Sequence, residues 1–156
     1  MIRIMFVCHG NICRSPMAEF IMKKLVSDAG LSAEFEISSA ATSTEEIGNP
    51  VYPPAREELR RHGLSCKGKT AVQLKASDYD KYDLFVTMDD FNMLNTRYIF
   101  SKNPSFTEDD GKVRKLLIFA GRNEDVSDPW YTRRFDIAYA DIYEGCTALL
   151  KTLTER

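Results

Sequence analysis

The sequence predicts a single-domain α/β protein with a four-stranded parallel sheet flanked by helices. Four short apolar runs alternate with segments whose apolar residues recur at helical spacing, as in consecutive βα units. The chain has 156 residues, enough for one domain with a sizeable core. Its 44% hydrophobic and 28% charged residues are typical of a folded globular protein. With no internal repeat or linker in the sequence, we expect residues 1–156 to form one domain.

The first part of the chain predicts two strands with a helix between them. Residues 2–7 are an apolar run and predict the first strand. Pro16 suits the first turn of a helix, and apolar residues keep helical spacing until Gly30. Residues 34–38 alternate between apolar and polar and predict the second strand. Residues 40–53 are rich in Ser, Thr, Pro and Gly, which favours a surface loop.

The middle of the chain repeats this order. A second helix is expected to begin at Pro54 and to end near Gly63, a typical helix-stopping residue. A short helical turn near residues 77–81 precedes the third predicted strand, residues 84–88.

The last part of the chain predicts one more strand and two helices. Asp89 or Asp90 can cap the first helix. Its apolar positions are Phe91, Leu94, Tyr98 and Ile99. A polar, turn-like stretch from Asn103 to Gly111 separates it from residues 115–119, the fourth predicted strand. The apolar face of the final helix is expected to contain Phe135, Ile137, Ala138, Ile142, Tyr143, Ala148 and Leu149.

Charge and hydropathy exclude several classes of partner. The net charge of −2 provides no general basic field for nucleic acid or anionic lipid. No apolar stretch approaches the length of a membrane span, and the N-terminal apolar run is too short for a signal peptide. We therefore expect a cytoplasmic protein that binds neither nucleic acid nor membrane.

Four cysteines in a chain of this length do not make a disulfide scaffold, so reduced thiols are expected. Cys8, Cys13 and His9 lack a convincing zinc-ligand spacing, and no second cluster completes a metal site. Cys66 and Cys146 are interpreted as packing thiols.

The segment from Cys8 to Ser15 is the most informative part of the sequence. It lies on a short turn between a predicted strand and a predicted helix, where backbone N–H groups and the helix dipole favour an anion. Gly10 allows a tight turn, and Arg14 can grip two phosphate oxygens at once. A thiol beside a helix N-terminus and a cation ionises more readily than a free thiol, which makes Cys8 a candidate nucleophile. Ser15 can donate a hydrogen bond to its thiolate, and Asn11 can hold the turn through side-chain bonds.

The run Phe6–Glu19 (Phe-Val-Cys-His-Gly-Asn-Ile-Cys-Arg-Ser-Pro-Met-Ala-Glu) resembles the signature of the low-molecular-weight protein tyrosine phosphatases. The late Asp128-Pro129 pair, followed by Trp130 and Tyr131, is similar to the family's second landmark. The resemblance covers essentially the whole chain. It implies a phosphotyrosine phosphatase I-like fold, related to Rossmann-like and flavodoxin-like folds.

The resemblance also implies a reaction: hydrolysis of phosphotyrosine monoesters through a phosphocysteine intermediate, without a metal or cofactor. Cys8 would be the nucleophile, Arg14 would bind the phosphate, and Asp128 would be the general acid and base. The phosphate-binding residues would be His9, Gly10, Asn11, Ile12, Cys13, Arg14 and Ser15. The partners implied are tyrosine-phosphorylated proteins or peptides as substrates, with phosphate and other oxyanions as inhibitors.

The expected substrate pocket contains Ile12, Trp130 and Tyr131. The rings of Trp130 and Tyr131 can form the walls of a slot for an aromatic ring. In the related protein-arginine phosphatases the Ile12 position is threonine, so isoleucine favours phosphotyrosine. Glu45 or Glu46 stands where family members often carry an aromatic at the pocket mouth. This difference puts ring stacking at the mouth in doubt and disfavours acidic peptides.

Three further residues have a role by resemblance and an ordinary alternative. Ser39 and Asp89 resemble family positions that support the phosphate-binding loop, but they also suit a strand end and a helix cap. Cys13 can form a reversible disulfide with Cys8 in the family. Its alternative role is packing.

Other functions on the same sequence remain open. A thioredoxin-coupled arsenate reductase needs a redox cysteine pair after the third strand, and residues 80–100 contain no cysteine. A protein-arginine phosphatase is opposed by Ile12. A non-catalytic anion-binding module is opposed by the joint presence of Cys8, Arg14 and Asp128. The oligomeric state is expected to be a monomer or a weak homodimer, since aromatics near the pocket can self-associate.

Overall fold

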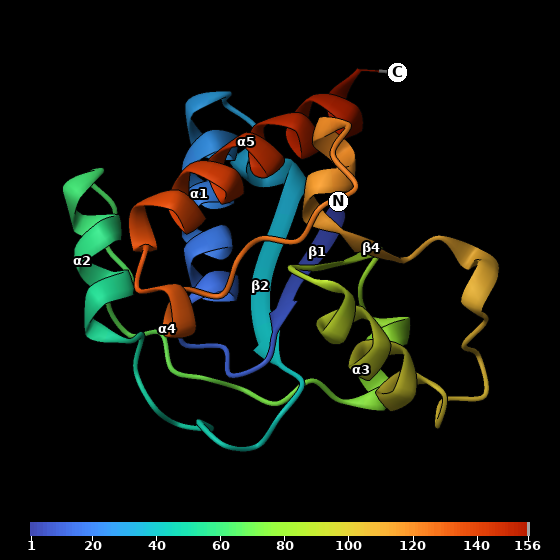
Figure 1. The fold of residues 1–156 in the computed structure, drawn as a ribbon. Coiled ribbons are helices and arrows are strands. Elements are labelled where there is room, and N and C mark those ends of the chain that lie inside the picture. Colours follow the sequence, from blue (N-terminus) through green and yellow to red (C-terminus); the bar gives the residue numbers. More distant parts are fainter. Residues whose placement is uncertain (156) are drawn as a thin grey trace.

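The computed structural model describes residues 1–155, which contain one sheet of four parallel strands in the order β2-β1-β3-β4 (Figure 1). The strands are β1 (Ile2–Cys8), β2 (Phe35–Ala41), β3 (Leu84–Thr87) and β4 (Val113–Lys115). The helices are α1 (Arg14–Asp28), α2 (Pro53–Arg61), α3 (Asp90–Phe100), α4 (Pro129–Thr132) and α5 (Phe135–Thr154). The predicted fold class, with four parallel strands flanked by helices, is therefore confirmed.

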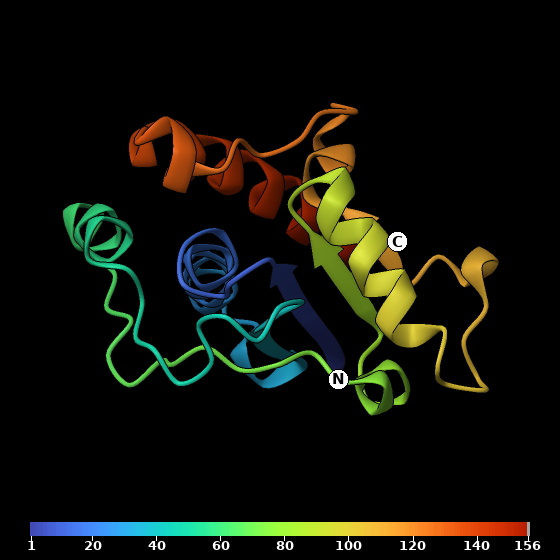
Figure 2. The same cartoon turned by 60° about the horizontal axis from the view of Figure 1, so that its bottom comes forward.

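Helices cover both faces of the sheet, with α1 and α5 on one face and α3 on the other (Figure 2). The alternation of side chains along β1 divides the core between these layers. Ile4 and Phe6 point to the larger cluster beneath α1 and α5. Met5 and Val7 point to a smaller cluster that includes Phe100 of α3. Because both faces are buried, β1 is apolar along its whole inner length, as the sequence predicted.

The carboxyl edge of the sheet contains a topological switch point. From β1 the chain moves to β2 on one side, and later returns to β3 on the other side of β1. Open parallel α/β sheets bind ligands in the crevice formed where neighbouring connections diverge in this way. Residues that follow β1 and β3 are therefore placed to meet at one site.

The prediction of a fourth strand over residues 115–119 is wrong in its position. β4 ends at Lys115, and Leu116–Ala120 form a 3₁₀ helix. A strand would point Leu116 and Leu117 to opposite faces, whereas this turn buries both side chains. Leu116 packs on α5 at Gly145, where an added Cβ would lie 2.5 Å from Leu116 Cγ. Packing against α5 thus overrides the strand preference of the apolar run.

Several predicted apolar positions lie on the surface. On α3, Phe91, Leu94 and Tyr98 are exposed, and on α5 so are Ile137 and Tyr143. The buried residues of α3 are instead Asn92, Thr96 and Phe100. Asn92 is buried because its side-chain oxygen accepts a hydrogen bond from Met88 N at 3.1 Å, at the end of β3. A local polar contact therefore sets which face of α3 points inward.

Boundaries differ by a few residues. α1 begins at Arg14 rather than Pro16, so the first helical turn reaches into the cysteine–arginine turn. β2 continues to Ala41, which pairs with Cys8, and the loop expected from residue 40 begins after it. Asp89 caps α3 by accepting a hydrogen bond from Asn92 N at 2.7 Å. Among residues 1–155, no helix has both the length and the apolarity needed to span a membrane.

Candidate active site

Residues 8–15 form a closed loop between the end of β1 and the start of α1. Asn11 has a φ of 59°, the left-handed region that asparagine tolerates better than most residues. Its side-chain oxygen accepts a hydrogen bond from Val72 N at 3.1 Å, which holds the loop against a neighbouring segment. The tight turn was expected at Gly10, whereas the residue of this loop with a left-handed backbone is Asn11.

Cys8 lies at the floor of this loop and is almost completely buried. Its Sγ lies 2.9 Å from Ser15 Oγ, and Asn11 N donates a hydrogen bond to the same sulfur at 3.3 Å. A hydroxyl and a backbone N–H therefore both contact the sulfur, and both can donate to a negative charge on it. The predicted contact between Cys8 and Ser15 is confirmed.

Arg14 lies beside the loop with its side chain only 3% exposed. Its Nη1 donates hydrogen bonds to Asp89 Oδ2 and to Val126 O, each at 2.8 Å, and Nη2 lies 3.4 Å from Asp128 Oδ2. Burial lowers the pKa of Arg14, but the negative groups Cys8, Asp128 and Asp89 together raise it by more, so the net shift of the pKa is upward. Arg14 is thus a fixed positive charge, and Asp89 both caps α3 and orients the guanidinium.

A buried chain of hydrogen bonds supports the loop from behind. Asn11 Nδ2 donates to Ser15 Oγ at 2.7 Å and to Ser39 Oγ at 2.9 Å. Ser39 Oγ in turn donates to Glu19 Oε1 at 2.6 Å. Lys69 Nζ lies 3.5 Å from that carboxylate and donates to Ser39 O at 3.0 Å. Ser39 therefore contacts the loop support from within β2, and the strand end expected there lies at Ala41.

Two members of this hydrogen-bond network, Glu19 and Lys69, were not predicted from the sequence. One signal was available: Glu19 follows Ser15 by four residues, which places both on one face of α1. Lys69 lies fifty residues later in an irregular segment, where no local pattern indicates its partner.

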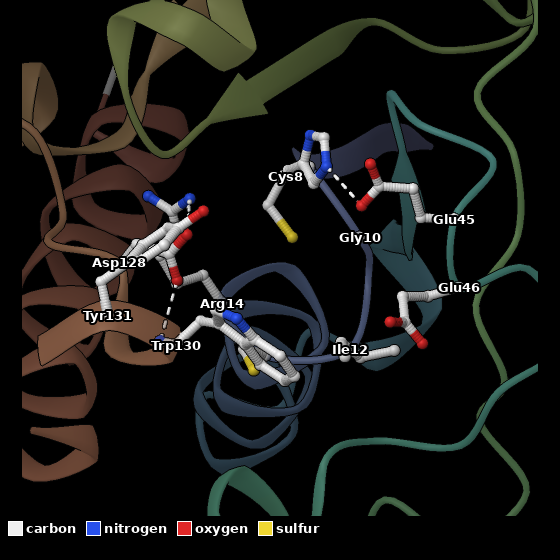
Figure 3. Close-up of a pocket in the computed structure, with 11 residues that line it drawn as sticks. Cys8, Gly10, Ile12, Arg14, Glu45, Glu46, Asp128, Trp130 and Tyr131 are labelled. Atoms are coloured by element: carbon white, nitrogen blue, oxygen red, sulfur yellow. Dashed lines mark hydrogen bonds and ion pairs between the residues drawn. The ribbon is translucent and has the colours of Figure 1, made fainter. Parts of the chain in front are cut away.

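Asp128 and the two aromatic residues after it form one wall of the site (Figure 3). Asp128 caps the short helix α4 by accepting a hydrogen bond from Trp130 N at 3.0 Å through Oδ1. Its other oxygen, Oδ2, faces Arg14. Trp130 packs on Tyr52, with ring centroids 4.8 Å apart, and Tyr131 is 81% exposed. Tyr52, which the sequence analysis did not single out, thus supports the aromatic wall.

The opposite wall of the site carries the carboxylates of Glu45 and Glu46 (Figure 3). The two walls enclose a pocket of about 390 Å³. Glu45 Oε2 lies 3.0 Å from His9 Nε2, and Glu46 Oε2 accepts a hydrogen bond from Asn49 Nδ2 at 2.6 Å. Ile12 is buried between the walls as an apolar lining residue. The predicted pocket residues Ile12, Glu45, Glu46, Trp130 and Tyr131 line this pocket together with Cys8, His9, Gly10, Cys13, Arg14 and Asp128.

Comparison with known proteins identifies the family. The sequence model of the "low molecular weight phosphotyrosine protein phosphatase" family matches residues 3–156. The chain belongs to this family. It is 37% identical over 156 residues to the low molecular weight protein-tyrosine-phosphatase YfkJ of Bacillus subtilis, covering 98% of this chain and 96% of the relative. It is 32% identical over 154 residues to the low molecular weight phosphotyrosine protein phosphatase of Gallus gallus, covering 98% and 94%. The family resemblance is therefore confirmed.

Solved structures agree with this assignment. The crystal structure of YfkJ superimposes with a TM-score of 0.92 at 35% identity, covering 99% of this chain and 96% of the other. A Drosophila arginine phosphatase superimposes with a TM-score of 0.88 at 30% identity, covering 97% and 98%. The fold is thus shared by a protein named a tyrosine phosphatase and one named an arginine phosphatase.

The other thiols of this phosphatase are held in their neutral form. The pKa of Cys13 is raised to about 12, mainly by burial and also by the nearby Cys8 and Asp128. Burial also raises the pKa of Cys66 and of Cys146. All four cysteines of the described chain are free thiols. Cys66 and Cys146 pack in the core as predicted, and a Cys8–Cys13 disulfide stays a prediction.

Residues 1–155 contain no cluster of three or more His, Cys, Asp and Glu side chains suited to a metal ion. The charged side chains that line the pocket are instead those of Arg14, Asp128, Glu45 and Glu46.

Proposed function

We propose that this protein is a protein-tyrosine phosphatase that hydrolyses phosphotyrosine in proteins through a phosphocysteine intermediate. One observation carries the proposal: a thiol in contact with a hydroxyl and a backbone N–H, a buried guanidinium and a carboxylate converge in one pocket with an aromatic wall. These groups are the nucleophile, the anion-binding group and the proton donor that the reaction needs. The apolar and aromatic lining suits the ring of the substrate.

The first step transfers the phosphoryl group to the enzyme. The Cys8 thiolate attacks phosphorus, the S–P bond forms, and the bond from phosphorus to the phenolic oxygen breaks. Asp128 donates its proton to that oxygen, so tyrosine leaves as a neutral phenol. Arg14 and the loop N–H groups neutralise the charge on the three remaining oxygens, which is the main requirement of phosphoryl transfer.

The second step releases phosphate. Asp128, now a carboxylate, takes a proton from a water molecule as the water oxygen attacks phosphorus. The S–P bond breaks, and the electron pair returns to Cys8 as a thiolate. Ser15 donates a hydrogen bond to the departing sulfur, which its distance of 2.9 Å allows. The products are tyrosine and inorganic phosphate, and phosphate in the same loop would act as a competitive inhibitor.

A substrate comparison tests this function against the arginine phosphatase alternative. We expect wild-type protein to hydrolyse phosphotyrosine peptides at least about 100-fold faster than phosphoserine or phosphoarginine peptides. Equal rates on phosphotyrosine and phosphoarginine, or no turnover of any of them, would contradict the proposal.

Ile12→Thr tests which residue sets this preference. A threonine hydroxyl at the pocket wall can accept a hydrogen bond from a guanidinium, whereas the isoleucine side chain offers only apolar contact. We expect the ratio of kcat/KM for phosphotyrosine over phosphoarginine to fall by about tenfold, which is the change in kcat/KM expected from one such hydrogen bond. Ile12→Val is the matched control, because valine has the shape of threonine without the hydroxyl. An equal fall in both variants would attribute the effect to lost volume rather than to the hydroxyl.

The carboxylates Glu45 and Glu46 at the pocket mouth support a preference for phosphotyrosine beside basic residues. Two unit charges about 4 Å apart in water interact by ~1 kcal/mol, or roughly fivefold in binding. We therefore expect a peptide with lysine next to phosphotyrosine to exceed its glutamate counterpart by about five- to tenfold in kcat/KM at low salt, with the ratio falling as salt is added.

Glu45→Gln combined with Glu46→Gln should bring that ratio close to one while leaving the hydrolysis of phenyl phosphate unchanged. Glu34→Gln combined with Glu36→Gln is the matched control, since it removes the same two charges at the amino end of β2, away from the pocket, and should not alter the ratio. A ratio that persists in the double variant would place the selectivity elsewhere.

The proposal extends to the setting of the enzyme. We place it in the cytoplasm, acting on phosphoproteins as a monomer or a weak homodimer. The exposed aromatics Trp130 and Tyr131 at the pocket mouth support weak self-association, because apolar rings of this size favour contact with another surface.

A further inference from the structure

A buried lysine outside the pocket connects two segments that the reaction depends on. Lys115 is the last residue of β4, and its side chain is only 5% exposed. Its Nζ lies 2.9 Å from Asp125 Oδ1 and 3.0 Å from Asp90 Oδ1. Burial lowers the pKa of Lys115, but the two carboxylates together raise it by more, so the ammonium stays charged. The side chains of Asp90 and Asp125 are 78% and 48% exposed, so the carboxylates reach the lysine from the surface. Loss of both pairs would leave the ammonium without a charged partner, which is costly for a buried group.

The two carboxylates belong to the segments that hold Arg14 and Asp128. Asp90 is the first residue of α3 and follows Asp89, which bonds Arg14. Asp125 precedes Asp128 by three residues, a span of about 10 Å at most. Asp90 N also donates a hydrogen bond to Asp125 Oδ1 at 3.2 Å, so the same carboxylate oxygen binds both the lysine and the start of α3.

Two hydrogen bonds of Val126 also hold the backbone between Asp125 and Asp128. Val126 N donates to Met88 O at 2.8 Å, and Arg14 Nη1 donates to Val126 O at 2.8 Å. The contacts of Asp125 with Lys115 and Asp90 add an attachment one residue before Val126. Asp128 is fixed to the start of α4, since its carbonyl accepts from Tyr131 N and Thr132 N at 3.1 Å. The attachments at Asp125 and Val126 therefore place Asp128 and α4 relative to the start of α3.

We propose that Lys115 is a positioning residue for the general acid of this phosphatase. It holds residues 125–128 against the start of α3, so that the Asp128 carboxyl faces the leaving oxygen. This inference rests on the proposed function, in which Asp128 protonates the leaving phenol. A displacement of about 1 Å in such a group can cost up to ~100-fold in rate.

The test is the dependence of kcat/KM on the leaving group, measured for a series of substituted phenyl phosphates. In Lys115→Met we expect about tenfold loss on phenyl phosphate, whose leaving group needs a proton, and less than about twofold loss on a nitrophenyl ester, whose leaving group does not. The inhibition constant for phosphate should change by less than about threefold, because Asp89 still holds Arg14. Lys115→Arg should recover most of the loss, since a guanidinium can span the same two carboxylates.

Lys112→Met is the matched control. Lys112 precedes β4, at the end away from the site, and bonds Tyr79 O at 2.7 Å, so the same substitution there should leave the leaving-group dependence unchanged. If Lys115→Met does not fold, Asp125→Asn applies the same criteria, because it removes the charge and keeps the shape. Equal losses on both esters, or no loss on either, would overturn the role of Lys115. If instead an Asp128 variant lost the same fraction of kcat/KM on both esters relative to wild type, that result would contradict the proposed function.

Discussion

Replacing Cys8 with serine should reduce turnover of phenyl phosphate by a factor of about 10⁴ or more, since the alcohol of serine is not ionised at neutral pH and is a weak nucleophile. Phosphate should still bind, because Arg14 and the loop N–H groups remain. Serine also preserves the hydrogen bond to Ser15 and nearly the same volume. Steady-state kinetics and calorimetric titration with phosphate measure the two quantities separately.

Cys66→Ser makes the same atomic change at another buried thiol, outside the loop. It should keep activity within about threefold of wild type, as expected for a residue that does not touch substrate. More than about 1% of wild-type activity in Cys8→Ser would show that Cys8 is not the nucleophile. Loss of phosphate binding along with activity would show that the variant had damaged the loop.

Replacing Asp128 with asparagine should slow phenyl phosphate hydrolysis by about 10²–10⁴-fold, the usual contribution of a general acid. Phenol has a pKa near ~10 and leaves slowly without a proton, whereas a nitrophenol leaves readily. The loss on a nitrophenyl ester should therefore be below about tenfold in kcat/KM. Asparagine keeps the cap of α4, because its side-chain oxygen can still accept from Trp130 N.

Asp136→Asn is the matched control, since Asp136 lies in the first turn of α5 and pairs with Arg134 rather than with a pocket residue. Asp136→Asn should leave kcat/KM unchanged for both phenyl phosphate and the nitrophenyl ester. Equal losses on the two esters in Asp128→Asn would argue that Asp128 orients Arg14 or substrate and transfers no proton.

The residues closest to the chemistry could be predicted because they are contiguous. Cys8, Gly10, Asn11, Arg14 and Ser15 lie within eight positions, on one turn between a strand and a helix. For such a segment the local conformation and the chemistry are encoded together, and the structure confirms the contact of Cys8 with Ser15. Asp128 could be placed only through the family resemblance, because more than a hundred residues separate it from the loop.

The supporting residues could not be predicted in the same way. Glu19 contacts Ser39 and Lys69 across three segments, and Tyr52 supports Trp130 across half of the chain. Each of these residues has an ordinary local interpretation as a surface or packing side chain. Their roles follow from distances that only the folded chain defines.

By itself, the sequence determined the βα order, the apolar strands and the phosphate-binding turn, since these depend on neighbouring residues and on periodicity. The tertiary structure alone decided where the fourth strand ends and what Lys115 does. Packing of Leu116 against Gly145 of α5 stops β4 at Lys115 and places its ammonium between Asp90 and Asp125. Contacts between distant segments have no local signature, because their energy depends on the packed arrangement of the whole chain.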